Sequence, residues 1–196
     1  MRCISIHSVH LTKIMQSKSE IKAGFTSKWE EITSLVSRTD VTGFTYTSAP
    51  EIWSIAEEFD HVIKSSSAVS SAMKVSPFIL KWKFGKPNRP LRNYDEILHK
   101  YTTALASVDG RAVAPSPFTS EEGKAFDKEN MLKHWESTLA KFDQRINKWS
   151  DKNLDNVLLP HPLLGKMMVR ELLYFTHLHT EHHRKSLEKK ANSLLK

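Results

Sequence analysis

Histidines are the residues in this chain whose spacing is best suited to chemistry. The sequence contains ten of them, and four lie in the stretch HLHTEHH at 177–183. On a helix, side chains four positions apart share one face and lie about 6 Å from each other. His179 and His183 have this spacing, which no other pair in the stretch has. Their two imidazoles could therefore bind one divalent metal ion, as helical histidine pairs do in zinc enzymes.

The apolar residues before this pair indicate which way it faces. One stripe at helical spacing contains Met168, Leu172, Phe175, His179 and His183. Two histidines thus occupy positions where the stripe favours leucine, and buried imidazoles need partners that a metal ion can supply. We expect the pair to face the interior, and His177 and His182 to point to the surface.

A metal site needs at least a third ligand, for which His61 is the best candidate. Helical phase does not favour it directly, because it lies away from the apolar stripe of its own segment. Its face carries small residues, among them Ser65 and Ala68, that would leave room for a cavity. This pattern is compatible with a ligand that faces a pocket and equally with a polar outer face.

Four segments have the periodicity of helices and must position these histidines. The first two span about 17–38 and about 50–73. The third begins at a capping signal at Thr119 or Ser120 and runs to about 149, and the fourth runs from the turn at 160–165 to about 193. No proline falls inside their interiors, where one would cost roughly 3 kcal/mol. The third is the clearest, with a seam of Leu132, Trp135, Leu139, Phe142, Ile146 and Trp149.

A long connection separates the second segment from the third. It contains five prolines and a short predicted helix at 94–107. Such a crossover lets the neighbouring helices run parallel. The sequence therefore predicts an all-α protein, a four-helix bundle with a long proline-containing crossover between helices 2 and 3. We expect one domain over 17–196, preceded by a poorly ordered extension at 1–16.

Composition excludes several classes of protein. Apolar runs are too short to span a bilayer, the N-terminus does not resemble a signal peptide, and the single Cys3 fits a reducing cytoplasm. The net charge is +7, but basic residues alternate with acidic ones along most of the chain. The densest basic stretch, 81–92, is expected to be a solvated crossover rather than a polyanion site. We expect a cytoplasmic protein without a specific nucleic-acid or membrane partner.

Several motifs and their order resemble the DinB-like (YfiT-like) superfamily of metal-dependent four-helix bundles. They are WSIAEEFDH at 53–61, HPLLGK at 161–166, ELLYF at 171–175 and HTEHHR at 179–184. The resemblance covers about residues 17–193. One departure concerns the family's HHRGQ, which here reads HHRKS at 182–186. A role for the missing glutamine is therefore not carried over.

The resemblance implies that His61, His179 and His183 together bind a divalent ion, nickel or zinc above all. It also implies one of two reactions on a small-molecule substrate: transfer that depends on a low-molecular-weight thiol, or hydrolysis. A non-catalytic metal-binding or stress-related bundle is the alternative, and a basic nucleic-acid binder is a third hypothesis. Bundles of this type often associate, so a homodimer is compatible with the sequence. No catalytic residue is assigned.

Metal-bound histidines usually donate their other ring nitrogen to a carboxylate or a carbonyl. Glu57 lies one turn before His61 and is the first candidate for this role. Glu181 is a weaker candidate, because it lies on a different face from His179 and His183. Three neutral imidazoles would leave the ion with an open position, which is the catalytic arrangement rather than the closed structural one.

Overall fold

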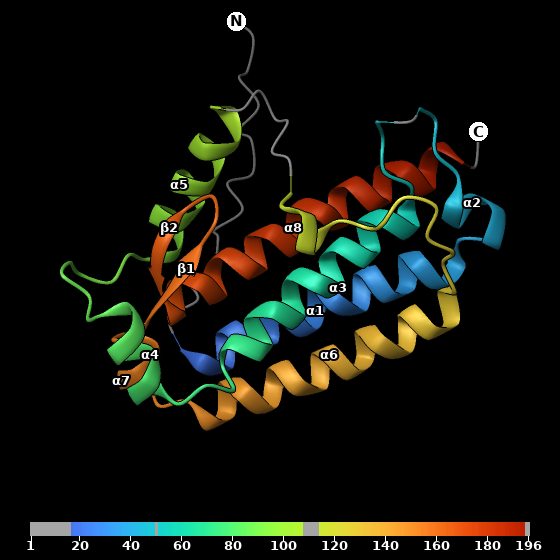
Figure 1. Cartoon of the computed structure of the whole chain (residues 1–196). Helices are drawn as coiled ribbons and strands as arrows, with labels where there is room; N and C mark the ends of the chain where they lie inside the picture. The colour runs from blue at the N-terminus through green and yellow to red at the C-terminus, as the bar shows by residue number, and fades with distance from the viewer. Residues whose placement is uncertain (1–16, 50, 108–113, 195–196) are drawn as a thin grey trace, which may run out of the picture.

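Four long helices form the body of the protein in its computed structural model, which describes residues 17–49, 51–107 and 114–194. They are α1 (Lys18–Arg38), α3 (Ile55–Ala72), α6 (Lys128–Lys148) and α8 (Val169–Ser193). Each helix packs on two others, α1 and α3 each lying against both α6 and α8 (Figure 1). The predicted four-helix bundle is confirmed. The expected extension at 1–16, with Cys3, lies outside the described residues.

Aromatic side chains fill the centre of the bundle. Trp29 of α1 and Trp135 of α6 are buried with their rings 4.8 Å apart, and Phe25 meets Phe142 edge to face at the same distance. The indole nitrogen of Trp135 donates to Thr33 Oγ1 at 3.1 Å, so the buried polar atom is satisfied. The seam expected in the third segment is the buried face of α6, with Leu132 and Leu139 at its edge.

Two helix starts differ from the sequence prediction. Helix α3 begins at Ile55 rather than near 50, because Ser54 and Glu57 form a capping box there. Ile52 precedes the helix and is 49% exposed. Helix α6 begins at Lys128 behind an Asp127 cap, not at Thr119 or Ser120. The Ser120 hydroxyl instead donates to Asp60 of α3 at 2.8 Å, which holds this part of the crossover against α3.

The crossover between α3 and α6 carries its own helices. These are α4 (Pro77–Phe84), α5 (Tyr94–Ala106) and the 3-10 helix η1 (Ser116–Phe118). Helix α5 confirms the short helix expected at 94–107, whereas α4 was not predicted. The expectation of a wholly solvated basic stretch at 81–92 is wrong in part, because Arg89 and Arg92 both bind the buried carboxylate of Glu171.

A short hairpin leads into α8. Strands β1 (Leu158–His161) and β2 (Gly165–Met168) pair antiparallel, and Gly165 ends the turn with a φ of +72°. The expected turn is present, but strands of four residues are too short for their pattern to show in the sequence. Two short helices, α2 (Val41–Thr45) and α7 (Asp151–Leu154), complete the described elements. In the described part of the chain, no helix is both long and apolar enough to cross a membrane.

Candidate metal centre

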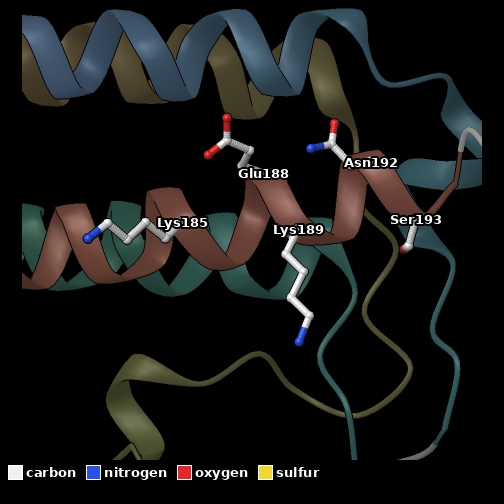
Figure 2. A pocket seen from close by; sticks show the side chains of 5 residues that line it. All are labelled: Lys185, Glu188, Lys189, Asn192 and Ser193. Atoms are coloured by element: carbon white, nitrogen blue, oxygen red, sulfur yellow. The ribbon is translucent and has the colours of Figure 1, made fainter. Parts of the chain in front are cut away.

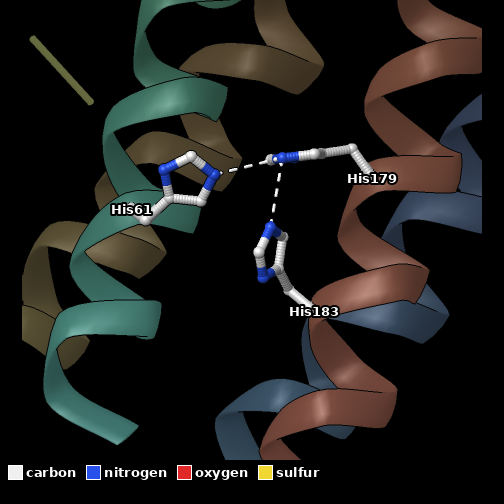
Figure 3. Close-up of side chains that lie close together, drawn as sticks. All are labelled: His61, His179 and His183. Atoms are coloured by element: carbon white, nitrogen blue, oxygen red, sulfur yellow. Dashed lines mark hydrogen bonds between the residues drawn. The ribbon is translucent and has the colours of Figure 1, made fainter. Parts of the chain in front are cut away.

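Three histidines from two helices point their ring nitrogens at one another (Figure 3). Helix α3 supplies His61, and α8 supplies His179 and His183 one turn apart. The Nε2 atom of His179 lies 3.1 Å from the Nε2 atoms of both His61 and His183. One nitrogen from each ring lies within 4.8 Å of the other two, so the three side chains could hold a metal ion.

His61 is oriented by the crossover. Its Nδ1 lies 2.9 Å from the carbonyl oxygen of Phe118 in η1. Since a carbonyl only accepts, Nδ1 carries the proton and Nε2 presents its lone pair to the cluster. The loop is held in place by Lys64, whose ammonium donates to the Thr119 carbonyl, and by Asp60, which binds Lys124 at 3.0 Å.

His183 is oriented by a buried carboxylate. Its Nδ1 lies 2.7 Å from Oε1 of Glu58, which is only 3% exposed. Burial raises the pKa of Glu58, but the hydrogen bond and charge of His183, with the charge of Lys190, lower it to about 2. Glu58 is therefore ionised and only accepts, so Nδ1 of His183 is protonated and donates to it. The other oxygen of Glu58 accepts from Ser186 at 2.9 Å and from the Lys190 ammonium.

His179 lies between the other two and is held by packing. Its ring stacks on Phe175 with centroids 5.3 Å apart and planes 27° from parallel. Burial lowers the pKa of His179 well below its usual value, and burial likewise lowers the pKa of His61 to about 4. Both rings are thus neutral near pH 7, the form in which imidazole binds metal.

A bound cation would satisfy the three inward nitrogens better than hydrogen bonds among them can. When all three rings are neutral, the form that binds metal, His61 and His183 each turn an unprotonated Nε2 toward Nε2 of His179, which carries one proton at most. One of the two contacts must then bring lone pair against lone pair, and a bound cation would satisfy all three nitrogens. Two nitrogens held tetrahedrally at zinc distances lie roughly 3.3 Å apart, close to the 3.1 Å seen here.

Aromatic side chains surround the triad. The Trp53 ring packs 5.1 Å from His61, and the Tyr101 ring of α5 lies 6.5 Å from His179. His61 and His183 are buried, whereas His179 is half-buried and reachable from solvent. His182 is exposed as expected. His177 is half-buried instead, with Nδ1 2.9 Å from the Tyr94 hydroxyl.

The two carboxylates proposed to orient the histidines do not do so. Glu57 closes the capping box with Ser54, and Glu181 binds Lys28 and Arg184. Sequence reasoning missed Glu58, the residue that makes the contact. Its signal was present: Glu58 lies three residues after Ile55 and four before Val62, within the apolar stripe of its helix. An acidic residue at such a position indicates a buried partner.

A surface depression of about 480 Å³ lies elsewhere on α8. It is lined by Lys185, Glu188, Lys189, Asn192 and Ser193, all from the last turns of the helix. Figure 2 shows that Glu188 and Lys189 extend to opposite sides, so these groups do not converge on a common point. Glu188 is also paired with Arg184 at 3.1 Å. The triad, rather than this depression, is the candidate functional site.

The architecture and the triad together define a helical bundle with a three-histidine cluster between two of its helices. The DinB superfamily model matches residues 25–187, and the chain belongs to this superfamily. Among solved structures it is similar to TT2238, described as a four-helix bundle protein, with a TM-score of 0.56 over 88% of this chain and 99% of that one. Sequence identity to TT2238 is 13%, so this similarity concerns the fold alone. No curated protein matches the chain.

Proposed function

We propose that this protein binds a divalent metal ion through His61, His179 and His183 and is a metal-dependent enzyme acting on a small molecule. The observation that carries the proposal is the convergence of three Nε2 atoms, two of which belong to rings whose Nδ1 protons are already engaged. Membership of the DinB superfamily supports it. Nitrogen ligands admit several ions, of which we propose nickel or zinc.

Three protein ligands distinguish this site from a closed structural one. A divalent ion bound there would keep its +2 charge and an open position, and so would lower the pKa of a bound water or thiol or polarise a carbonyl. Glu58 and the Phe118 carbonyl fix the tautomers of the ligands, which is the usual task of such outer partners. Trp53 and Tyr101 flank the triad, and the half-buried His179 is the ligand with solvent exposure.

Two reaction classes suit this chemistry. One is transfer of a low-molecular-weight thiol to an electrophilic substrate, and the other is hydrolysis of an amide or ester. Both use a nucleophile whose pKa is lowered toward neutrality. We further propose a cytoplasmic location, because a chain with one cysteine has no need of an oxidising compartment.

Metal content tests the first part of the proposal. Purified wild type, stripped with a chelator and titrated with Zn²⁺ or Ni²⁺ by calorimetry, is expected to bind one ion per chain. His61→Ala and His179→Ala should each abolish stoichiometric binding. His182→Ala is the matched control, because it removes an exposed histidine from the same helix and should bind like wild type. Wild-type occupancy in His61→Ala would refute the three-histidine site.

Catalysis is tested separately. The metal-loaded protein is screened with thiols plus electrophiles and with simple amides and esters, and any activity is retested in His61→Ala. Turnover that requires an added thiol supports the transferase, and turnover without one supports the hydrolase. Stoichiometric metal with no turnover in either screen would favour the non-catalytic metal-binding bundle.

A further inference from the structure

Helix α4 turns an apolar face away from the protein. Val75 lies in the bend just before α4, and Phe78, Ile79 and Trp82 follow one another on the helix at steps of one and three residues, so these three share one side of it. The four side chains are 38%, 80%, 50% and 83% exposed, whereas Leu80 on the opposite side is 4% exposed and packs into the core. The helix is therefore anchored by one apolar face and presents a second to solvent.

This patch differs from ordinary exposed hydrophobic residues. Single exposed apolar side chains are common on protein surfaces, and here Val41 of α2 and Leu163 of the hairpin turn are examples. Phe78 and Trp82 are the most exposed large hydrophobic side chains in the described part of the chain, and they are neighbours on one helix turn. Contiguous patches of this kind mark surfaces that bind proteins or membranes.

Positive charge surrounds the patch. Residues 74–92 contain six lysines and arginines and no acidic residue. Arg89 and Arg92 are bound to Glu171, and Lys81 binds Asn153 of α7, which lies beside α4 (Figure 1). The remaining three, Lys74, Lys83 and Lys86, are exposed and make no ion pair with any described residue.

The neighbouring acidic residues do not offset this charge. Asp151 and Asp155, at the start and end of α7, both pair with the buried guanidinium of Arg170. Lys166 of β2 donates to the Phe84 carbonyl at 2.9 Å and adds a further ammonium at the C-terminal end of α4. The outer surface of α4 is thus an apolar stripe within a rim of lysines.

We propose that this outer face of α4 adsorbs to the surface of an anionic lipid bilayer. Tryptophan and phenylalanine beside lysines on a short helix suit the boundary between headgroups and acyl chains, where the rings leave water and the ammonium groups meet lipid phosphates. A second copy of the chain docked through the same face would set lysines against lysines. A nucleic acid would match the charge but leave Ile79 and Val75 without an apolar environment. The expectation of no membrane partner rested on the absence of a spanning segment, which adsorption does not require.

Vesicle binding of the full chain tests this directly. Vesicles of phosphatidylcholine alone and with about one third phosphatidylglycerol are titrated, and only the anionic ones are expected to bind. Trp82 reports the contact, because three of the other four tryptophans are at most 5% exposed and Trp53 is half-buried. Binding should shift tryptophan emission to the blue in wild type. Trp82→Phe should keep the binding and lose the shift.

Paired variants separate the patch from the overall charge. Lys83→Gln with Lys86→Gln is expected to weaken binding to anionic vesicles about 25-fold, since each lysine near such a surface contributes roughly fivefold. Lys133→Gln with Lys141→Gln removes the same charge from the exposed face of α6 and should change binding little. Trp82→Ser should weaken binding, whereas Tyr46→Ser, at another exposed aromatic residue, should not.

Several outcomes would overturn the proposal. These are absence of binding to anionic vesicles, equal binding to neutral ones, and equal losses in the α4 and α6 lysine variants. If the protein does not bind vesicles but binds duplex DNA in a way that depends on Trp82, the face is a nucleic-acid site. If it does not bind vesicles but forms a dimer that Trp82→Ser abolishes, the face is a dimer interface. His61→Ala should bind vesicles like wild type, so this result is independent of the metal site.

Discussion

Helix α8 carries two buried polar clusters that differ in whether their contacts are complete. Near its start, the carboxylate of Glu171 is fully buried yet accepts from Arg89, from the side chain and backbone of Arg92, and from the backbone of Met168. These contacts are 2.5–3.1 Å long, and both oxygens of the carboxylate accept from a guanidinium group. Everything that this cluster requires is supplied by the chain.

The histidine cluster, two turns further along α8, is complete only on its outer side. The Nδ1 protons of His61 and His183 are bound by Phe118 and Glu58, but when the rings are neutral the three inward Nε2 atoms have at most one proton among them. A cluster whose charges and hydrogen bonds close on themselves stabilises the fold. One that directs lone pairs at a common point requires a cation, and this difference separates the structural cluster from the functional one.

The largest predicted effect that distinguishes the histidine cluster from the Glu171 cluster is stabilisation of the folded protein by metal. At a free Zn²⁺ or Ni²⁺ concentration a thousandfold above Kd, the free energy of unfolding of wild type should rise by about 4 kcal/mol, because the ion binds the folded state alone. His179→Ala should show no such rise. Urea unfolding of the chelator-treated protein, with and without metal, measures the effect. Equal stabilisation of both proteins would place the ion elsewhere.

Removing the Glu171 charge should damage stability without touching metal binding. Glu171→Gln leaves two guanidinium groups facing a neutral amide, and breaking a buried ion pair in this way costs about 3 kcal/mol. Urea unfolding measures the loss, and Glu136→Gln, an exposed carboxylate on α6, is the control expected to change stability little. A tenfold loss of metal affinity in Glu171→Gln would break the distinction between the two clusters.

The same carboxylate should make the protein sensitive to acid. Burial raises the pKa of Glu171, but hydrogen bonds from Arg89 and Arg92 lower it to about 2, against 4.5 for the free side chain. The unfolded state therefore binds this proton first, and the stabilisation present above pH 4.5 is lost as the pH falls toward 2. Glu171 should account for about 3 kcal/mol of the stability lost over this range in metal-free protein. Glu171→Gln should therefore lose about 3 kcal/mol less than wild type, and the fall that remains comes from other carboxylates with lowered pKa, such as Glu58.

The histidine pair on α8 was predictable from sequence because one helix determines it. Four-residue spacing and an apolar stripe are local properties, and they correctly indicated that His179 and His183 share a face. His61 was different. Its helical phase pointed away from the stripe, yet it is 6% exposed, because η1 and the following loop cover that side of α3. Residues more than fifty positions away bury His61, and burial of this kind leaves no periodicity in the sequence of α3. The family resemblance therefore supplied the evidence that selected His61 as a ligand.

Errors at element boundaries have the same origin. The capping candidates at 119–120 were plausible locally, but Ser120 is bound to Asp60, a contact across sixty residues. The Glu171 cluster was missed because its arginines lie in the crossover, about eighty positions away. By contrast, the seam of α6 and the short helix α5 followed from local pattern alone.

The smallest effect concerns the carboxylate that links the triad to the rest of the protein. Glu58→Gln keeps the shape of the side chain but removes the charge that holds the His183 proton on Nδ1. Losing an outer partner of this kind costs about 10- to 100-fold in metal affinity. Calorimetric titration with Zn²⁺ or Ni²⁺ should show this loss with one ion still bound per chain.

Glu57→Gln is the matched control, since Glu57 precedes Glu58 on α3 but only caps the helix through Ser54. It should change stability little, because glutamine also closes a capping box, and leave metal affinity unchanged. If both variants lost affinity equally, the effect would come from α3 as a whole. If Glu58→Gln bound metal like wild type, the His183 tautomer would not depend on this carboxylate. Only the contact between His61 and the Phe118 carbonyl would then support the inference that the triad presents its lone pairs to a metal ion.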